Sequence, residues 1–230
     1  GEVLGIAGIS GNGQRELAES IAGLRAVTSG TISINGRTTT HCKPFQIRQA
    51  GLSYVPEERM RDGAIGEFKV KENLVLLNHD SNDMSRRGFL NFKKIDQHCE
   101  RLVEEYNVKT PDIETLTKSL SGGNIQKLIL ARELSSEPKV LIASQPTRGV
   151  DIGAAEYIHQ RISQQRKLGT ASLVISEDLD EVMALSDRIA VMFQGRIMGI
   201  VNRATATREN IGLMMTGDSL NAPARSEKEV

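Results

Sequence analysis

Residues 119–127 read Ser-Leu-Ser-Gly-Gly-Asn-Ile-Gln-Lys, and a buried helix is expected to begin within this stretch. Apolar side chains at Ile129, Leu130 and Leu134 lie on one helix face and predict that helix. The Ser-Gly-Gly turn, Ser121 to Gly123, therefore stands at a helix N-terminus. Its serine could simply cap the helix, or its backbone N–H groups could hold an anion.

A second glycine-rich stretch lies near the start of the chain. This glycine loop, Gly8 to Arg15, stands between the apolar run Val3–Ala7 and a helix expected over residues 14–23. In that setting backbone N–H groups and the helix dipole bind phosphate, although the glycine spacing alone would also suit a tight turn. The residues expected to form the phosphate site are Ser10, Gly11, Asn12, Gly13, Gln14, Arg15 and Glu16.

Two positions of the glycine loop lack the chemistry that a nucleoside triphosphate needs. A lysine at Gln14 would make charge-assisted bonds to phosphate, and the neutral amide loses roughly 1–2 kcal/mol by comparison. Arg15 stands where a hydroxyl would ligate Mg²⁺, and a guanidinium repels a metal, although it could partly neutralise phosphate itself. We therefore expect this pocket to hold no metal and to bind nucleotide weakly.

Short apolar runs alternate with helical stretches along the chain. Strands are expected at residues 3–7, 52–55, 140–143, 172–175 and 189–193, and helices at 154–168 and 179–185. Asn35-Gly36 predicts a small antiparallel β element. The alternation predicts an α/β fold in which helices flank a mostly parallel sheet.

The stretch from residue 71 to 120 has a different texture: it is polar and helical, with no strand-like apolar run. With the helix that follows, it predicts an inserted helical subdomain at about residues 71–135, within one domain of residues 1–217. Residues 218–230 are polar and are expected to form a disordered tail. A buried strand at the very first residues suggests a domain truncated at its N-terminus and cut from a longer polypeptide.

Composition narrows the classes of partner. The 29 basic and 29 acidic residues give zero net charge, aromatics make up 3 % and Trp is absent, which disfavours a nucleic-acid partner. Two distant cysteines and four scattered histidines form neither a disulfide framework nor a metal-ligand pattern. No apolar run approaches the roughly 20 residues that span a bilayer, so a membrane role would act through a partner.

The order of these motifs resembles the nucleotide-binding domains of ABC transporters, which have a P-loop NTPase-type fold. The resemblance runs from Gly1 to about Gly217. Its details are closest to the second, C-terminal ATPase module of bacterial importers for simple sugars and nucleosides. The stretches that carry it are Gly5–Gln14, Val55–Arg59, Leu120–Lys127 and Ile142–Asp151.

The resemblance implies that the pocket of this chain is degenerate. Ser144 stands where the family has a Mg²⁺-ordering aspartate, Gln145 where it has a catalytic glutamate, and Glu177 where it has a switch histidine. Glu57 replaces the glutamine of the Q-loop, whereas Asp151 of the D-loop is retained. Because glutamine is not a base, a loss of about 10²–10⁴-fold in rate is implied.

The resemblance also implies a division of labour between two modules of one chain, paired head to tail. Ser121, Gly122, Gly123 and Gln126 would then contact ATP held by the N-terminal module, with Mg²⁺ mainly at that partner site. ATP hydrolysis would drive transport in the two-module assembly, while this domain alone would be inactive or very weak. The implied partners are membrane-spanning permease subunits and, indirectly, a solute-binding protein, with the module peripheral on the cytoplasmic face of the inner membrane.

Three points stay open. In the family a groove beside the Q-loop receives a short helix of the membrane subunit, and here the charged segment Glu57 to Asn73, with Arg59 and Arg61, would be either partner-facing or merely solvated. A soluble ABC protein without transport function, or a regulatory nucleotide-binding module, is the alternative function. The solute cannot be identified, although Asn124–Lys127 and Ser144–Thr147 lean towards nucleosides.

Overall fold

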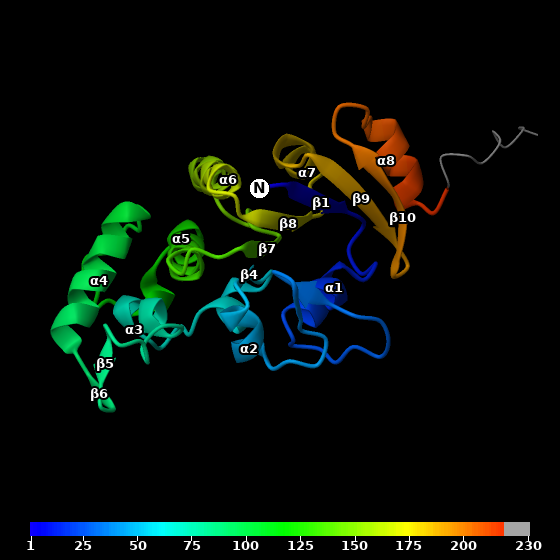
Figure 1. Ribbon diagram of the computed structural model, residues 1–230. Coiled ribbons are helices and arrows are strands. Elements are labelled where there is room, and N and C mark those ends of the chain that lie inside the picture. The colour runs from blue at the N-terminus through cyan, green and yellow to red at the C-terminus, as the bar shows by residue number, and fades with distance from the viewer. Residues whose placement is uncertain (219–230) are drawn as a thin grey trace, which may run out of the picture.

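A six-stranded sheet forms the centre of the computed structural model, with strand order β10-β9-β1-β8-β7-β4 (Figure 1). The structure describes residues 1–218, and of Arg86 it describes the backbone alone. Neighbouring strands are parallel, except that β10 runs antiparallel to β9. The predicted mostly parallel sheet is therefore confirmed. The strands are β1 Val3–Ala7, β4 Leu52–Val55, β7 Val140–Ser144, β8 Ala171–Ser176, β9 Arg188–Phe193 and β10 Arg196–Asn202.

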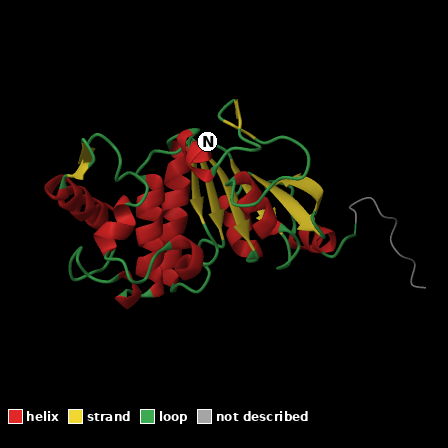
Figure 2. Cartoon of the chain, turned by 90° about the horizontal axis from the view of Figure 1, so that it is seen from below, coloured by secondary structure: helices red, strands yellow, loops and turns green. Residues whose placement is uncertain are grey.

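Helices cover both faces of this sheet (Figure 2). Successive side chains of a strand point to opposite faces, so Leu141 and Ala143 of β7 join one core and Ile142 joins the other. The Leu141 side is covered by α5 and α6, and the Ile142 side by α1 and α2. These helices are α1 Gln14–Ile21, α2 Pro44–Gln49, α5 Gly122–Leu134 and α6 Ile152–Lys167, while α7 Leu179–Leu185 lies against β1 and β8.

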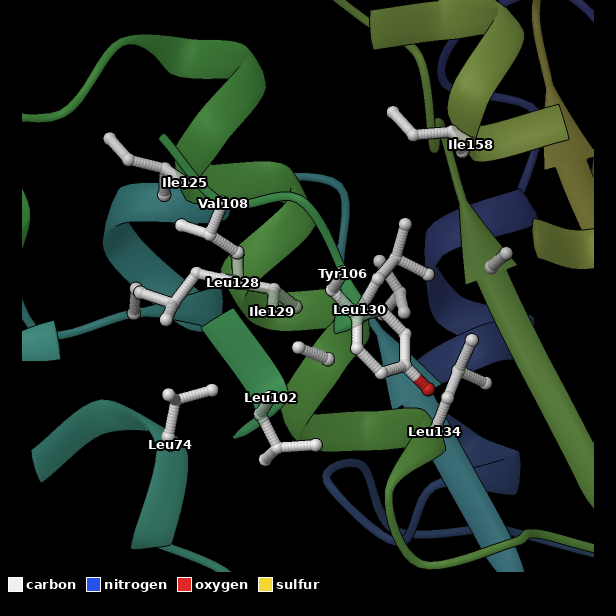
Figure 3. Packing of buried hydrophobic residues seen from close by; sticks show 14 of the residues in the cluster. Leu74, Leu102, Tyr106, Val108, Ile125, Leu128, Ile129, Leu130, Leu134 and Ile158 are labelled. Carbon is white, nitrogen blue, oxygen red and sulfur yellow. The ribbon is translucent and has the colours of Figure 1, made fainter. Parts of the chain in front are cut away.

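A group of helices lies at one end of the sheet, where α5 contacts α3 Val70–Val75 and α4 Phe92–Glu105. Leu74, Leu102 and Leu128 form the contact between these three helices (Figure 3). Helix α5 also packs on β4 and α6, and for this reason all ten residues from Ile125 to Leu134 are buried. The Ser-Gly-Gly turn thus begins a helix that has no solvent-facing side beyond its first turn.

Tight turns shape the small β elements. Asn35 and Gly36 both have left-handed backbones, and they join β2 Ser33–Ile34 to β3 Arg37–Thr38 as predicted. A second hairpin, β5 Ser85–Arg86 with β6 Phe89–Leu90, lies within residues 71–120, which the sequence predicts to be helical. Its strands are only two residues long, so they leave no apolar alternation in the sequence. The expected extent of the helical subdomain, 71–135, remains a prediction.

The C-terminal part adds two elements that the sequence analysis did not predict, β10 and α8 Arg208–Met215. Helix α8 packs on β9 through the buried side chains of Ile211 and Met214. Apart from Asp218, the predicted disordered tail falls outside the described residues. Within residues 1–218 no helix combines the length and the apolar character that crossing a membrane requires.

Candidate functional site

The glycine loop and the ends of β7 and β8 enclose a cavity of about 230 Å³. The carboxyl ends of parallel strands meet at one edge of a sheet, which is where ligands of such folds bind. Nine of the residues that the sequence predicts for the pocket line this cavity, together with Ile175. They are Ser10, Gly11, Gln14, Arg15, Glu16, Glu57, Ser144, Gln145 and Glu177.

The other two predicted loop residues, Asn12 and Gly13, do not line the cavity but contact the turn at Gln194 and Gly195. Asn12 accepts hydrogen bonds from the backbone N–H of Gln194 through its side chain and of Gly195 through its carbonyl, both at 2.8 Å. Gly13 has a left-handed backbone with φ 104°, and a Cβ there would lie 3.2 Å from the Cα of Gly195. The glycine loop therefore rests on the turn between β9 and β10.

Gln14 is turned back onto the glycine loop. Its Nε2 donates to the carbonyl of Ile9 at 3.0 Å, and the side chain is only 8 % exposed. Gly8 leaves the room for it, since a Cβ there would lie 2.5 Å from that same Nε2. The side chain that would be a phosphate-binding lysine instead cross-links the backbone of its own loop.

Arg15 is held by carboxylates of its own chain. Its Nε bonds Oε1 of Glu19 at 2.6 Å, and its Nη2 lies 3.4 Å from Asp62. The hydrogen bond from Arg15 lowers the pKa of Glu19 below its ordinary value. Glu19 also pairs with Arg25, and Asp62 also pairs with Arg61, so these two carboxylates do not neutralise Arg15 alone. The expectation that Arg15 partly neutralises phosphate stays a prediction.

Gln145 links the ends of two strands. It has a left-handed backbone with φ 48°, and its N–H donates to the carbonyl of Ile175 at 2.7 Å. Its side-chain oxygen accepts from the N–H of Glu177 at 3.2 Å. Ser144 beside it is buried. Neither an amide nor a serine hydroxyl can take a proton from water as a carboxylate does.

These residues do not fit a magnesium-bound triphosphate. Among the described residues that line the cavity, Arg15 carries the one positive charge, whereas Glu16, Glu57 and Glu177 carry three negative charges. Glu57 is in turn paired with Arg148. Across residues 1–218 no group of three acidic, histidine or cysteine side chains is placed to hold a metal ion.

The Ser-Gly-Gly turn presents a different environment. Ser121 makes no side-chain cap bond to the backbone of α5, and its hydroxyl instead accepts from Nδ2 of Asn124 at 2.9 Å. Its interpretation as a simple helix cap is therefore wrong. Ser121 is exposed, and the first N–H groups of a helix have no partner within the helix. The turn therefore presents free backbone N–H groups to a ligand, at the positive end of the helix dipole.

Two neighbours pack closely around this turn. A Cβ at Gly123 would lie 2.9 Å from the Cβ of Ala154 and 3.3 Å from a carboxylate oxygen of Asp151. Asp151 caps α6 by accepting from the N–H of Ala154 at 2.9 Å, which explains why α6 starts two residues earlier than predicted. Gln126, one turn further along α5, is buried.

Arg59 contacts the turn from the other side. Its guanidinium donates to the carbonyls of Gly122 and Gly149, each at 3.1 Å, and to that of Arg148. A cation near a helix N-terminus costs about 0.3–1 kcal/mol, whereas each bond from a charged donor contributes about 1.5–3 kcal/mol before exposure weakens it. The three bonds therefore outweigh the unfavourable position. Arg59 is half-buried and is bonded to backbone carbonyls of its own chain, and whether its segment faces a partner stays a prediction.

Comparison with known proteins agrees with this architecture. The family model described as "ABC transporter" matches residues 1–148. The chain belongs to the ABC transporter family.

Relatives within the ABC family are import proteins. The nucleoside import ATP-binding protein NupA of Lactococcus lactis is 47 % identical over 96 % of this chain and 44 % of its own length. The guanosine import ATP-binding protein NupO of Bacillus subtilis is 43 % identical over 95 % of this chain and 43 % of its own. The glucose import ATP-binding protein TsgD13 of Haloferax volcanii is 47 % identical over 94 % and 40 %. The chain thus spans less than half the length of these relatives.

Solved structures of ABC cassettes share the fold. A dimeric, post-hydrolysis state of the ATP-binding cassette MJ0796 bound to ADP and Pi superimposes with a TM-score of 0.75 at 20 % identity, covering 88 % of this chain and 85 % of that one. A nucleotide-free cassette from an ABC transporter gives 0.69 at 23 % identity, covering 87 % and 80 %. At this identity the likeness establishes the ABC cassette fold.

This ABC cassette also carries a groove between its sheet and its helical part. The groove measures about 620 Å³. Phe45 and Leu77 line it with partly exposed rings and methyl groups, 59 % and 38 % exposed. The residues around them come from α2, from the chain after α3, and from α4 and α5. Neither Arg59 nor Arg61 lines the groove, so the expected partner-facing segment, 57–73, lies outside it.

Proposed function

We propose that this chain is an ATP-binding module of an ABC importer and that it completes the ATP site of a partner module. The observation that carries the proposal is the start of α5, where exposed Ser121 leaves the helix backbone uncapped by a side chain. Backbone N–H groups and the helix dipole at that point suit the γ-phosphate of an ATP held by the partner. The donors would be the backbone N–H groups of Gly122 and Gly123, which have no partner within the helix.

The turn would act on the transition state of hydrolysis. Negative charge is spread over the γ-phosphoryl oxygens as its bond to the β-phosphate breaks. Donors that are already oriented towards that charge stabilise it at no further reorganisation cost. Mg²⁺ and the water-activating base would come from the partner module, because Ser144 and Gln145 supply neither.

The pocket of this chain would serve as a scaffold. Gln14 is hydrogen-bonded to Ile9 and Arg15 to Glu19, so both side chains have partners within the chain when no ligand is bound. Gln145 fixes the chain beyond β8 by accepting from Glu177. An isolated domain built in this way would hydrolyse ATP very slowly or not at all.

The proposed partners follow from the relatives and from the groove. Relatives more than twice as long as this chain leave room for a second ATPase module in the same polypeptide, which would be the N-terminal one. Their names mention nucleosides, guanosine, glucose and ribose, and we extend to this chain the class of nucleosides or simple sugars. The groove beside Phe45 would receive a helix of a membrane-spanning permease subunit, to which a solute-binding protein delivers the solute. The module would then sit peripherally on the cytoplasmic face of the inner membrane.

A charge placed at the turn tests the proposal without threatening the fold. Aspartate is a good helix cap, so Ser121→Asp should preserve the stability of α5 while repelling phosphate. In the full-length two-module protein we expect this variant to lose about 10²–10³-fold in ATP turnover. Ser121→Ala should lose far less, and Gln14→Ala should lose less than about threefold, because Gln14 lies in the scaffold pocket. Full turnover by Ser121→Asp would contradict the proposal.

A further inference from the structure

Arg59 joins three segments that are distant in the chain. From its position just after β4 it reaches Gly122, 63 residues away, and Gly149, 90 residues away. Both acceptors are glycines, and both leave space for the guanidinium. A Cβ at Gly149 would lie 2.8 Å from Nη2, and one at Gly122 would lie 3.1 Å from Nη1. The backbone around the Ser-Gly-Gly turn is therefore shaped to this one side chain.

The segment that begins with Arg59 is attached to α5 at both of its ends. It forms a wide, π-helical turn, η1 Arg59–Gly63. At its far end the carbonyl of Gly63 accepts from Nη2 of Arg132, a buried residue of the last turn of α5, at 2.6 Å. A Cβ at Gly63 would also lie 2.7 Å from the side chain of Ile129. The turn η1 thus lies along α5 and holds it from its first residue nearly to its last.

An arginine suits this position because its planar fork carries several donors in fixed directions. A lysine has one mobile ammonium group on a flexible stem, and its donors cannot be matched to three carbonyls in the same pre-set way. A second contact restrains the same two segments, since the Glu57 carboxylate pairs with the side chain of Arg148. Arg59 nevertheless provides the one described side-chain contact from this segment to the carbonyl of Gly122.

We propose that Arg59 is a positioning residue for the Ser-Gly-Gly turn. It would hold the start of α5 against residues 148–149, so that the N–H groups of the turn meet the γ-phosphate of the partner's ATP in one fixed orientation. This inference rests on the proposed function, because it assumes that the turn contacts ATP. It adds that the orientation of the turn is set by a side chain outside both nucleotide motifs.

The test compares variants of the full-length two-module protein in an ATP turnover assay. Arg59→Ala should lower kcat about 10–100-fold, because misplaced donors stabilise the transition state poorly. The KM for ATP should change less than about threefold, because the partner's own phosphate loop holds most of the nucleotide. Arg59→Lys should recover part of the loss.

Arg61→Ala is the matched control. Arg61 lies in the same turn η1, carries the same charge, and is 57 % exposed, with its described ion pair going to the adjacent Asp62. Its kcat should stay within about twofold of the unmodified protein. Both variants are assayed well below the thermal unfolding temperature of Arg59→Ala, so that unfolding does not account for a difference in turnover. If Arg59→Ala turns over ATP as fast as Arg61→Ala, the positioning role is refuted.

The remaining outcomes are also decisive. If Arg59→Ala does not fold, Arg59→Lys settles the question, since full turnover by the lysine variant shows that the planar fork is not needed. Ser121→Asp in the same assay separates the two proposals. Normal turnover by Ser121→Asp removes the proposed function itself, whereas loss in Ser121→Asp with normal turnover in Arg59→Ala removes the positioning role alone.

Discussion

Gln14 donates its side-chain amide to the carbonyl of Ile9 inside the glycine loop, at 3.0 Å. A loop that binds phosphate turns its donors outward to the anion. Here the side-chain amide of Gln14 is used within the loop, and the loop is closed on itself. The pocket therefore keeps the shape of a phosphate site while lacking its most important cation.

Restoring that cation should restore part of the affinity but no chemistry. In the isolated chain we expect Gln14→Lys to tighten ATP binding, measured without Mg²⁺ by titration calorimetry, by about tenfold, which corresponds to about 1.4 kcal/mol. Hydrolysis should remain undetectable, because Gln145 is not a base. Gln14→Ala removes the amide without adding charge and should give no gain. Equal affinities for the lysine and alanine variants would show that the pocket is closed for another reason.

The ion pair of Arg15 and Glu19 should give the domain a small acid-sensitive stability. Hydrogen bonds from Arg15 and then Arg25 hold the folded-state pKa of Glu19 below its ordinary value of 4.5, so the stability that these ion pairs contribute is complete above pH 4.5. It is then lost as the pH falls through the lower, folded-state pKa. Arg15 is 42 % exposed, and solvent screening keeps the contribution below about 1 kcal/mol.

Urea unfolding of the native chain and of Glu19→Gln checks this expectation. The difference in the free energy of unfolding between the two proteins should be steady near pH 7 and should shrink below pH 4.5. A difference that instead grows on acidification would have the wrong sign for a carboxylate stabilised by a guanidinium.

Gly123 should be required for the packing of α5 on α6, independently of any ligand. An alanine there would bring its Cβ to 2.9 Å from that of Ala154, so we expect Gly123→Ala to destabilise the fold by about 1–3 kcal/mol in urea unfolding. Gly212 of α8 is also helical but has nothing within 4 Å of a Cβ. Gly212→Ala should therefore stabilise by about 0.5–1 kcal/mol. Destabilisation of similar size at both sites would show that close packing is not the cause.

The groove should be needed for assembly with the permease but not for ATP turnover. Phe45 lines it and is 59 % exposed. We expect Phe45→Asp to abolish co-purification of the full-length protein with its membrane subunits, while its ATP turnover in their absence stays unchanged. Phe92→Asp is the matched control, because Phe92 is 64 % exposed and does not line the groove. Loss of co-purification in both variants would point to a general surface effect.

Local sequence patterns were sufficient for much of the fold. The buried run at Val140–Ala143 and the turn at Asn35-Gly36 depend on near neighbours in the chain, and both elements form where they were expected. The two-residue strands of the β5–β6 hairpin were missed because so short a pair has no periodicity to read. Strand β10 is not predicted from the sequence, since its residues are largely exposed and mixed in character.

The candidate site, too, was predictable from the sequence only in part. The glycine loop indicated that Gln14 cannot supply the usual chemistry, and the family resemblance implied the same for Gln145. The structure places both residues in one cavity. The orientation of each side-chain amide depends on backbone groups elsewhere in the chain. For Gln145 that group is the N–H of Glu177, which donates to its side-chain oxygen. The sequence predicts Arg59 only as a solvated or partner-facing charge, because nothing within a few residues reveals acceptors that lie 63 and 90 residues away.

The burial of α5 on all sides has a consequence for motion. Its amides from Ile125 to Leu134 can exchange with solvent hydrogen only when the surrounding core opens, so they should be among the slowest in the chain. A helix enclosed in this way cannot fray or roll by itself. Any displacement of residues 125–134 must carry the neighbouring helices along, so in the proposed assembly α5 would move together with α3, α4 and α6.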